Sequence, residues 1–380
     1  MVHKLNFFPL GNADCCRIDL AGGQKILFDC AHTRGADDPD DKRCDLHALL
    51  RDDFAANKRD YFDVVAFTHL DRDHYSGATD FFSLEHAKKY QGAKRIKINM
   101  MWVPAAVITE KVSDDPECEE ARILQAEARH RFKKGTGIRV FSRPERLKEW
   151  CEANDVNLDD RKPLVTDAGQ LAPEFSLVKH GVEFFVHSPF AVRQDDCTVE
   201  DRNADGIIMQ ATFTDGGTTA KVLLMADGAY ETLADIVKVT KKHGREERLE
   251  WDVAKLPHHC SYLSLGPEKG ADKTEPVEEV AWLYDDQGQD GGIIVSSSKP
   301  IPTKGSDEDE DPNPPHREAA NYYKDVLDAK GGEFVVTMEH PKESAPEPVV
   351  IEIDSGGTTL KVAARAAAVV ATSRPAPRAG

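Results

Sequence analysis

The 380-residue chain contains no run of eighteen consecutive apolar residues, so the sequence predicts no membrane-spanning helix. Residues 1–8 are too few, and too interrupted by polar side chains, to form a signal peptide. The eight cysteines include no Cys-x-x-Cys pair, which is typical of reduced thiols. From these absences we expect a cytoplasmic protein that does not associate with a membrane.

The chain lacks an excess of positive charge: 67 Asp and Glu outnumber 49 Lys and Arg, and the formal net charge is −18 at pH 7. Such a balance argues against binding of nucleic acid by bulk electrostatic attraction. Residues 84–146 depart from it, with fourteen Lys or Arg against nine Asp or Glu. This segment is either a solvated helical face or a surface that guides a phosphate-bearing substrate, and the sequence leaves both interpretations open. Its two basic clusters are Lys88, Lys89, Lys94, Arg95 and Lys97, and then Arg129, Arg131, Lys133 and Lys134.

The densest group of potential metal ligands follows an apolar, strand-like run at residues 64–67. Unpaired carboxylates and imidazoles at the end of a buried strand would cost several kcal/mol to desolvate, so a metal ion is their natural partner. Ligand sites of layered α/β proteins also tend to lie at the carboxyl ends of strands. Alternatively, two of the aspartates cap a helix that begins near Tyr75, but capping does not explain two flanking histidines. The four side chains are His69, Asp71, Asp73 and His74.

The pattern His-x-Asp-x-Asp-His at residues 69–74 resembles the His-x-His-x-Asp-His signature of the metallo-β-lactamase superfamily. The variant with aspartate at the second position is similar to the hydrolase domain of the competence protein ComEC and its soluble relatives. Other segments resemble motifs of that branch in the same order, and the resemblance covers most of residues 1–362. They are residues 10–16 (a Gly-x-Gly-Asp turn), 26–30 (the next strand), 222–228 (a Leu-Leu-x-Gly-Asp strand), 255–261 (a His-His-Gly-Ser motif) and 313–316 (an Asn-x-x-Gly-His-Pro loop).

The resemblance implies an α/β fold, a four-layer αββα sandwich, with two divalent metal ions. His69 and Asp71 would bind one ion, and Asp73 and His74 the other. Asp227 would bridge them. Because Asp71 replaces an imidazole with a harder ligand, manganese or magnesium becomes competitive with zinc.

One histidine of the pair at 258–259 would complete the second ion, and the other would contact the substrate or protonate the leaving group. We take His258 as the ligand and His259 as the catalytic partner, together with Asp73. His316 is a candidate for a phosphate contact. Cys260, which stands in place of the motif's glycine, is expected to be a small packing residue.

Many superfamily members supply a further histidine to the first ion, for which His180 and His187 are candidates. Residues 203–207 resemble an asparagine-rich segment of the ComEC branch. Asp14 and Asp29 are expected to accept hydrogen bonds from loop amides near the metals.

The sequence predicts one hydrolase domain over residues 1–365, in which residues 83–180 form an internal, partly helical elaboration that flanks the active-site cleft. Within it, residues 96–103 are typical of a strand and residues 117–134 and 144–153 of helices. Residues 366–380, rich in Ala, Pro and Arg, are expected to be a disordered tail.

Three functions remain open. The leading hypothesis is a metal-dependent phosphodiesterase, a nuclease that cleaves DNA. The second is a hydrolase of a small ester, lactone or phosphodiester, which the acidic composition favours. The third is a metal-stabilised, non-catalytic component of a larger complex, whose partner proteins the sequence does not specify.

Overall fold

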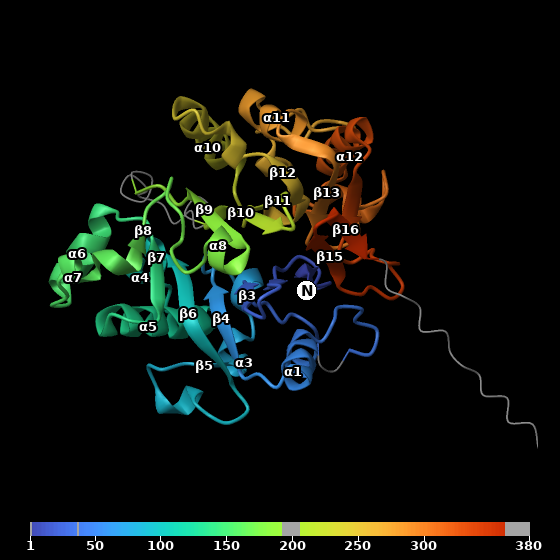
Figure 1. The fold of residues 1–380 in the computed structure, drawn as a ribbon. Coiled ribbons are helices and arrows are strands. Elements are labelled where there is room, and N and C mark those ends of the chain that lie inside the picture. Colours follow the sequence, from blue (N-terminus) through green and yellow to red (C-terminus); the bar gives the residue numbers. More distant parts are fainter. Residues whose placement is uncertain (1, 36–37, 192–205, 362–380) are drawn as a thin grey trace, which may run out of the picture.

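The computed structural model describes residues 2–35, 38–191 and 206–361. Two β-sheets pack face to face, and helices cover the outer face of each (Figure 1). This four-layer αββα sandwich confirms the predicted fold class. Among the described residues, no helix is long and apolar enough to cross a membrane. The predicted tail at 366–380 lies outside the described residues.

The first sheet has ten strands in the order β16-β15-β1-β2-β3-β4-β6-β7-β8, with β5 beside β6. Neighbouring strands from β3 to β8 run parallel, so their carboxyl ends meet along one edge of the sheet. The strands are β1 His3–Phe7, β2 Cys16–Asp19, β3 Lys25–Phe28, β4 Tyr61–Ala66, β5 Phe82–Ser83, β6 Ile96–Pro104, β7 Ile138–Phe141, β8 Val165–Thr166, β15 Val349–Asp354 and β16 Gly357–Lys361.

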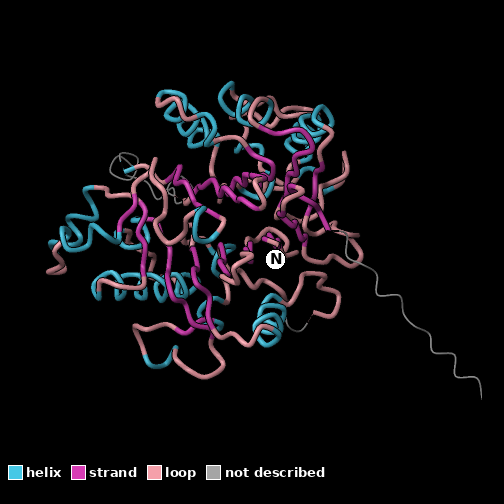
Figure 2. The backbone as a smooth tube through the Cα atoms, viewed as in Figure 1, coloured by secondary structure: helices cyan, strands magenta, loops and turns pink. Residues whose placement is uncertain are grey.

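The second sheet has six strands in the order β14-β13-β12-β11-β10-β9, and those from β11 to β14 run parallel. Figure 2 shows the strands of both sheets in magenta and the loops that connect them to the helices in pink. The strands are β9 Val182–Ser188, β10 Ile208–Asp215, β11 Thr218–Leu224, β12 Trp251–Lys255, β13 Gly288–Ser296 and β14 Glu333–Val336.

Three apolar clusters hold the layers together. The central one joins side chains of both sheets, such as Phe28 and Trp102 of the first with Phe184 of the second. The cluster outside the first sheet receives α1 Leu46–Ala56, α5 Glu119–Lys134 and α6 Glu145–Ala153. The cluster outside the second sheet receives α10 Tyr230–Lys242, α11 Glu278–Asp285 and α12 Arg317–Lys330.

The spacing of apolar residues explains why these helices lie flat on the sheets. In α10, Leu233, Ile236 and Val237 are buried, an i, i+3, i+4 pattern that places them on one helical face.

Residues 83–180 are part of the sandwich. Strands β6, β7 and β8 extend the first sheet, and α5 and α6 pack on its outer face. The strand predicted at 96–103 and the helices predicted at 117–134 and 144–153 are confirmed as β6, α5 and α6.

Candidate metal centre

The predicted ligands of the 69–74 motif lie directly after the carboxyl end of β4. Asp71 occupies the N-cap position of the short helix α2 Arg72–Tyr75, but its side chain makes no capping hydrogen bond. Asp73 and His74 lie within that helix. The capping interpretation therefore does not explain these aspartates, and the metal interpretation remains.

Asp227, after β11, lies between the two histidines of the motif. Its Oδ1 is 3.2 Å from His74 Nε2 and its Oδ2 is 3.9 Å from His69 Nε2. His69 Nε2, His74 Nε2 and Asp227 Oδ1 are buried and have no hydrogen-bond partner, despite the short distance between the last two. Ligand atoms about 2.1 Å from one shared metal ion lie about 3–4 Å apart, so these distances fit the expectation that Asp227 would bridge two ions.

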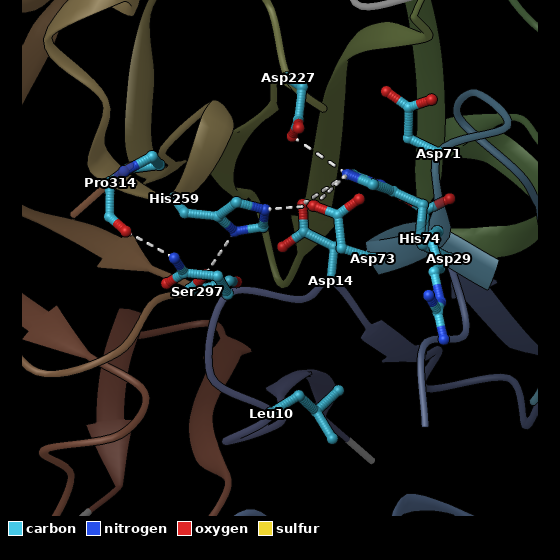
Figure 3. A network of polar contacts seen from close by, with 12 residues as sticks. Leu10, Asp14, Asp29, Asp71, Asp73, His74, Asp227, His259, Ser297 and Pro314 are labelled. Carbon is cyan, nitrogen blue, oxygen red and sulfur yellow. Dashed lines mark hydrogen bonds and ion pairs between the residues drawn. The ribbon is translucent and has the colours of Figure 1, made fainter. Parts of the chain in front are cut away.

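The side expected for the second ion has the fuller set of candidate ligands. One ligand atom each from Asp73, His74, Asp227 and His259 lies within 4.8 Å of the others. His259 Nε2 is 2.8 Å from Asp73 Oδ2 (Figure 3). On the side of the first ion, Asp71 Oδ2 is 3.7 Å from His69 Nε2.

Hydrogen bonds to the opposite ring nitrogens orient the imidazoles. His74 Nδ1 donates to Asp29 Oδ2 at 2.8 Å, and His259 Nδ1 donates to the Ser297 carbonyl at 2.7 Å. Asp29 also accepts from the Thr68 backbone N–H at 2.8 Å, which confirms its expected role toward a loop amide. Such outer partners fix the ring so that Nε2 faces the metal.

The electrostatics of the centre couple metal binding to protons. Burial lowers the pKa of His69, whereas the Asp227 and Asp29 carboxylates outweigh burial and raise the pKa of His74. Burial lowers the pKa of His259, but the hydrogen bond that His259 donates to Asp73 and the nearby carboxylates outweigh it, so the pKa is raised. A divalent ion that takes up these Nε2 atoms displaces their protons, so metal binding releases protons.

The loop after β12 has an unusual backbone. His258, His259 and Cys260 have φ angles of 47°, 54° and 67°, and Ala226, just before Asp227, has a φ of 40°. Positive φ is costly for residues other than glycine, and such strain clusters at functional sites. Cys260 is fully buried in the outer apolar cluster, as expected for a packing residue.

Of the histidine pair, the structure brings His259 and not His258 into the group of ligand atoms. His258 is half-buried, and its ring centroid lies 6.2 Å from that of His259. The assignment of His258 as the ligand stays a prediction, and the geometry favours the reverse assignment.

The remaining predicted histidines lie apart from the ligand atoms. His316 Nδ1 accepts from the Tyr262 N–H at 3.3 Å and its Nε2 donates to the Pro312 carbonyl at 3.3 Å, so both nitrogens are engaged. His187 donates to the Arg248 carbonyl at 2.8 Å, and His180 accepts from the Ser176 N–H. Most of the 203–207 segment lies outside the described residues.

Sequence reasoning placed Asp14 near the metals but missed its partner. Asp14, expected to bind a loop amide, pairs instead with the buried Lys255. Its Oδ2 is 3.8 Å from His74 Nε2. The only sequence signal was a lysine at the end of an apolar strand, within the 255–261 motif.

Mixed imidazole and carboxylate donors of this kind suit zinc or manganese, and the buried nitrogen and oxygen atoms without partners fit two such ions.

No family model matches the chain, and no curated protein matches it. Solved structures similar to it are metallo-β-lactamase-fold proteins. A new diphosphatase from the PhnP family is 10% identical, with 75% of this chain and 73% of that chain covered and a TM-score of 0.28. The metallo-β-lactamase SMB-1 bound to 2-mercaptoethanesulfonate is 14% identical, with 66% and 78% covered and a TM-score of 0.28.

BJP-1, a subclass B3 metallo-β-lactamase of Bradyrhizobium japonicum, is 15% identical, with 73% and 89% covered and a TM-score of 0.31. Likeness at this level carries no argument about activity. The assignment of the fold therefore rests on the strand order and the four layers of this chain.

Proposed function

We propose that the protein is a metal-dependent hydrolase that cleaves phosphodiester bonds at a centre of two divalent ions, with DNA as its substrate. One observation carries this proposal: the buried Asp227 carboxylate lies between the Nε2 atoms of His69 and His74, neither of which has a hydrogen-bond partner. A structural metal site does not need two adjacent ligand sets.

The chain supplies a set of ligands for each ion. His69, Asp71 and Asp227 would hold one, and Asp227 with Asp73, His74 and His259 would hold the other. When bound, the pair of ions supplies a water of lowered pKa and neutralises charge on the attacking and leaving oxygens.

His258 is the histidine left for the substrate. It is half-buried, and burial lowers its pKa. Its ring centroid lies 6.2 Å from that of His259, and its imidazole would protonate the leaving oxygen.

The placement of basic residues bears on the choice of substrate. The exposed Lys88, Lys89 and Lys94 precede β6, whose Lys97 aligns with Tyr61 at the amino end of β4. The metal ligands follow the opposite end of β4, about 20 Å away at about 3.3 Å per residue. The first basic cluster and the metal ligands therefore lie at opposite ends of β4.

The two arginines of the second basic cluster serve the fold. Arg131 forms a buried ion pair with Glu127 at 2.6 Å, and Arg129 donates to the Ile108 and Glu110 carbonyls. DNA as the substrate is thus supported by the order of the motifs alone, and the distance of the basic residues favours a second candidate, a small phosphodiester.

The test compares linear DNA, circular DNA and bis(p-nitrophenyl) phosphate, each with manganese, zinc or chelator. Asp227→Asn removes the bridging charge, and Asp325→Asn, on the exposed face of α12, is the matched control. Metal-dependent cleavage of DNA that only Asp227→Asn abolishes would support the nuclease. Cleavage of the small diester alone would favour the second candidate, and no cleavage by the metal-loaded protein would overturn both.

A further inference from the structure

A buried lysine lies against the candidate metal centre. Lys255, the last residue of β12, is 6% exposed, and its Nζ pairs with the Asp14 carboxylate. The same ammonium donates to the Ala226 carbonyl at 3.2 Å. Burial of an ammonium is unfavourable unless it is paired, so this lysine needs its anionic surroundings.

The partners of Lys255 connect it to both halves of the centre. Asp14 lies in the turn between β1 and β2, and its backbone N–H donates to the Asp73 carbonyl at 2.9 Å. Ala226 precedes the bridging Asp227. The Asp14 carboxylate also approaches the ligand His74, with 3.8 Å between Oδ2 and Nε2. The ammonium is therefore adjacent to the ligands contributed by each sheet.

The charge balance of the centre suggests a role for Lys255. Five carboxylates gather here, and two divalent ions would leave one negative charge without a counter-charge. Lys255 supplies the missing positive charge, and it does so within a buried site where solvent screening is weak. The five are Asp14, Asp29, Asp71, Asp73 and Asp227.

We propose that Lys255 acts as a third cation of the centre. Its ammonium neutralises the Asp14 carboxylate and thereby limits the affinity of the centre for divalent ions. This inference rests on the proposed metal centre. Without Lys255, the Asp14 carboxylate would be available to the ion whose ligand His74 lies beside it. A purely structural salt bridge between the sheets would have no such effect.

The two explanations predict opposite changes in the metal affinity when Lys255 is replaced. Manganese and zinc are titrated calorimetrically into metal-free protein of the wild type, Asp14→Asn, Lys255→Met and the double variant. If Lys255 is a counter-charge, Asp14→Asn lowers the metal affinity and Lys255→Met raises it, each by about tenfold or more. The double variant, which removes both charges, then stays within about threefold of the wild type.

If the pair only supports the fold, both single variants bind metal more weakly, and that result would overturn the inference. Asp14→Asn weakens metal binding under both explanations, so Lys255→Met and the double variant are the ones that distinguish them. If Lys255→Met fails to fold, an affinity of the double variant close to that of the wild type supports the inference, and a weakened affinity overturns it. Lys221→Met, which breaks the Lys221–Glu250 ion pair of the same sheet, is the control and should leave the affinity unchanged. A wild type that binds no metal would instead refute the proposed centre.

Discussion

His259 Nε2 lies 2.8 Å from the Asp73 carboxylate, although the two residues are 186 positions apart in the chain. Asp73 follows a strand of the first sheet and His259 a strand of the second, so a metal ion bound here would tie the two sheets together. Binding of an ion only to the folded state stabilises it by about 2.7 kcal/mol at a free concentration of 100 times Kd.

We therefore expect manganese or zinc to raise the Tm by several degrees relative to chelator. Thermal unfolding of the wild type and of Asp227→Asn measures this, and the variant should lose the metal-dependent increase. Identical Tm values with metal and with chelator would contradict the centre.

The two adjacent histidines should differ in their effect on metal binding. His259→Ala removes a ligand atom of the four-residue group, so we expect the metal affinity to fall by more than the roughly 10- to 100-fold typical of residues that only orient a ligand. His258→Ala should retain both ions and lose turnover. Metal content by elemental analysis distinguishes them, and loss of metal from His258→Ala instead would restore the original assignment.

Asp29 should matter for metal binding although it is not expected to touch the ions. Its carboxylate accepts hydrogen bonds from His74 Nδ1 and from the Thr68 backbone N–H. The φ angle of Asp29 itself is 59°. Asparagine tolerates positive φ, so Asp29→Asn removes the charge without adding backbone strain. We expect a loss of roughly 10- to 100-fold in metal affinity by calorimetry with the fold retained. An unchanged affinity would mean that the orientation of His74 does not depend on this carboxylate.

The sequence predicted the parts of the site that are local in the chain. His69 to His74 lie within one strand-turn-helix segment, so their convergence needs no knowledge of the packing. The helix-forming composition of α5, and the apolar residues on one side of α6, likewise located these helices to within a few residues.

Contacts between distant segments could not be predicted in the same way. Asp14 and Lys255 are 241 positions apart, and they meet only because the two sheets pack face to face. Which histidine of the pair faces the metals depends on three successive positive φ angles, which non-glycine residues do not signal. Composition likewise did not reveal that Arg131 points into the protein.

Arg131 should contribute to stability and not to metal or substrate binding. Its guanidinium donates to Glu127 at 2.6 Å and to the Ile98 carbonyl at 3.0 Å, all within the buried interior. Arg131→Met leaves the buried carboxylate without its cation, which typically costs about 3–5 kcal/mol. Denaturant unfolding should show this loss, whereas the exposed Lys133→Met should change the free energy of unfolding by about 0.5 kcal/mol or less. A small effect of both variants would refute the structural role.

His187 should make the stability of the protein depend on pH. Burial lowers the pKa of this histidine from 6.5 to about 4 in the folded state, while its Nε2 donates to the Arg248 carbonyl. Above pH 6.5 the residue is neutral in both states and its contribution is complete. As the pH falls from 6.5 toward 4, the unfolded state binds a proton that the folded state does not, so stability is lost, by about 3 kcal/mol in total.

His187→Gln can still donate to the same carbonyl but does not titrate. Between pH 6.5 and 4, with chelator present, its free energy of unfolding should therefore fall less steeply than that of the wild type, by up to one bound proton. The other titrating groups are common to both proteins, so the difference in slope isolates this residue. Equal slopes for the two proteins would show that folding does not lower the pKa of His187. An altered metal affinity of His187→Gln would make His187 a candidate ligand again.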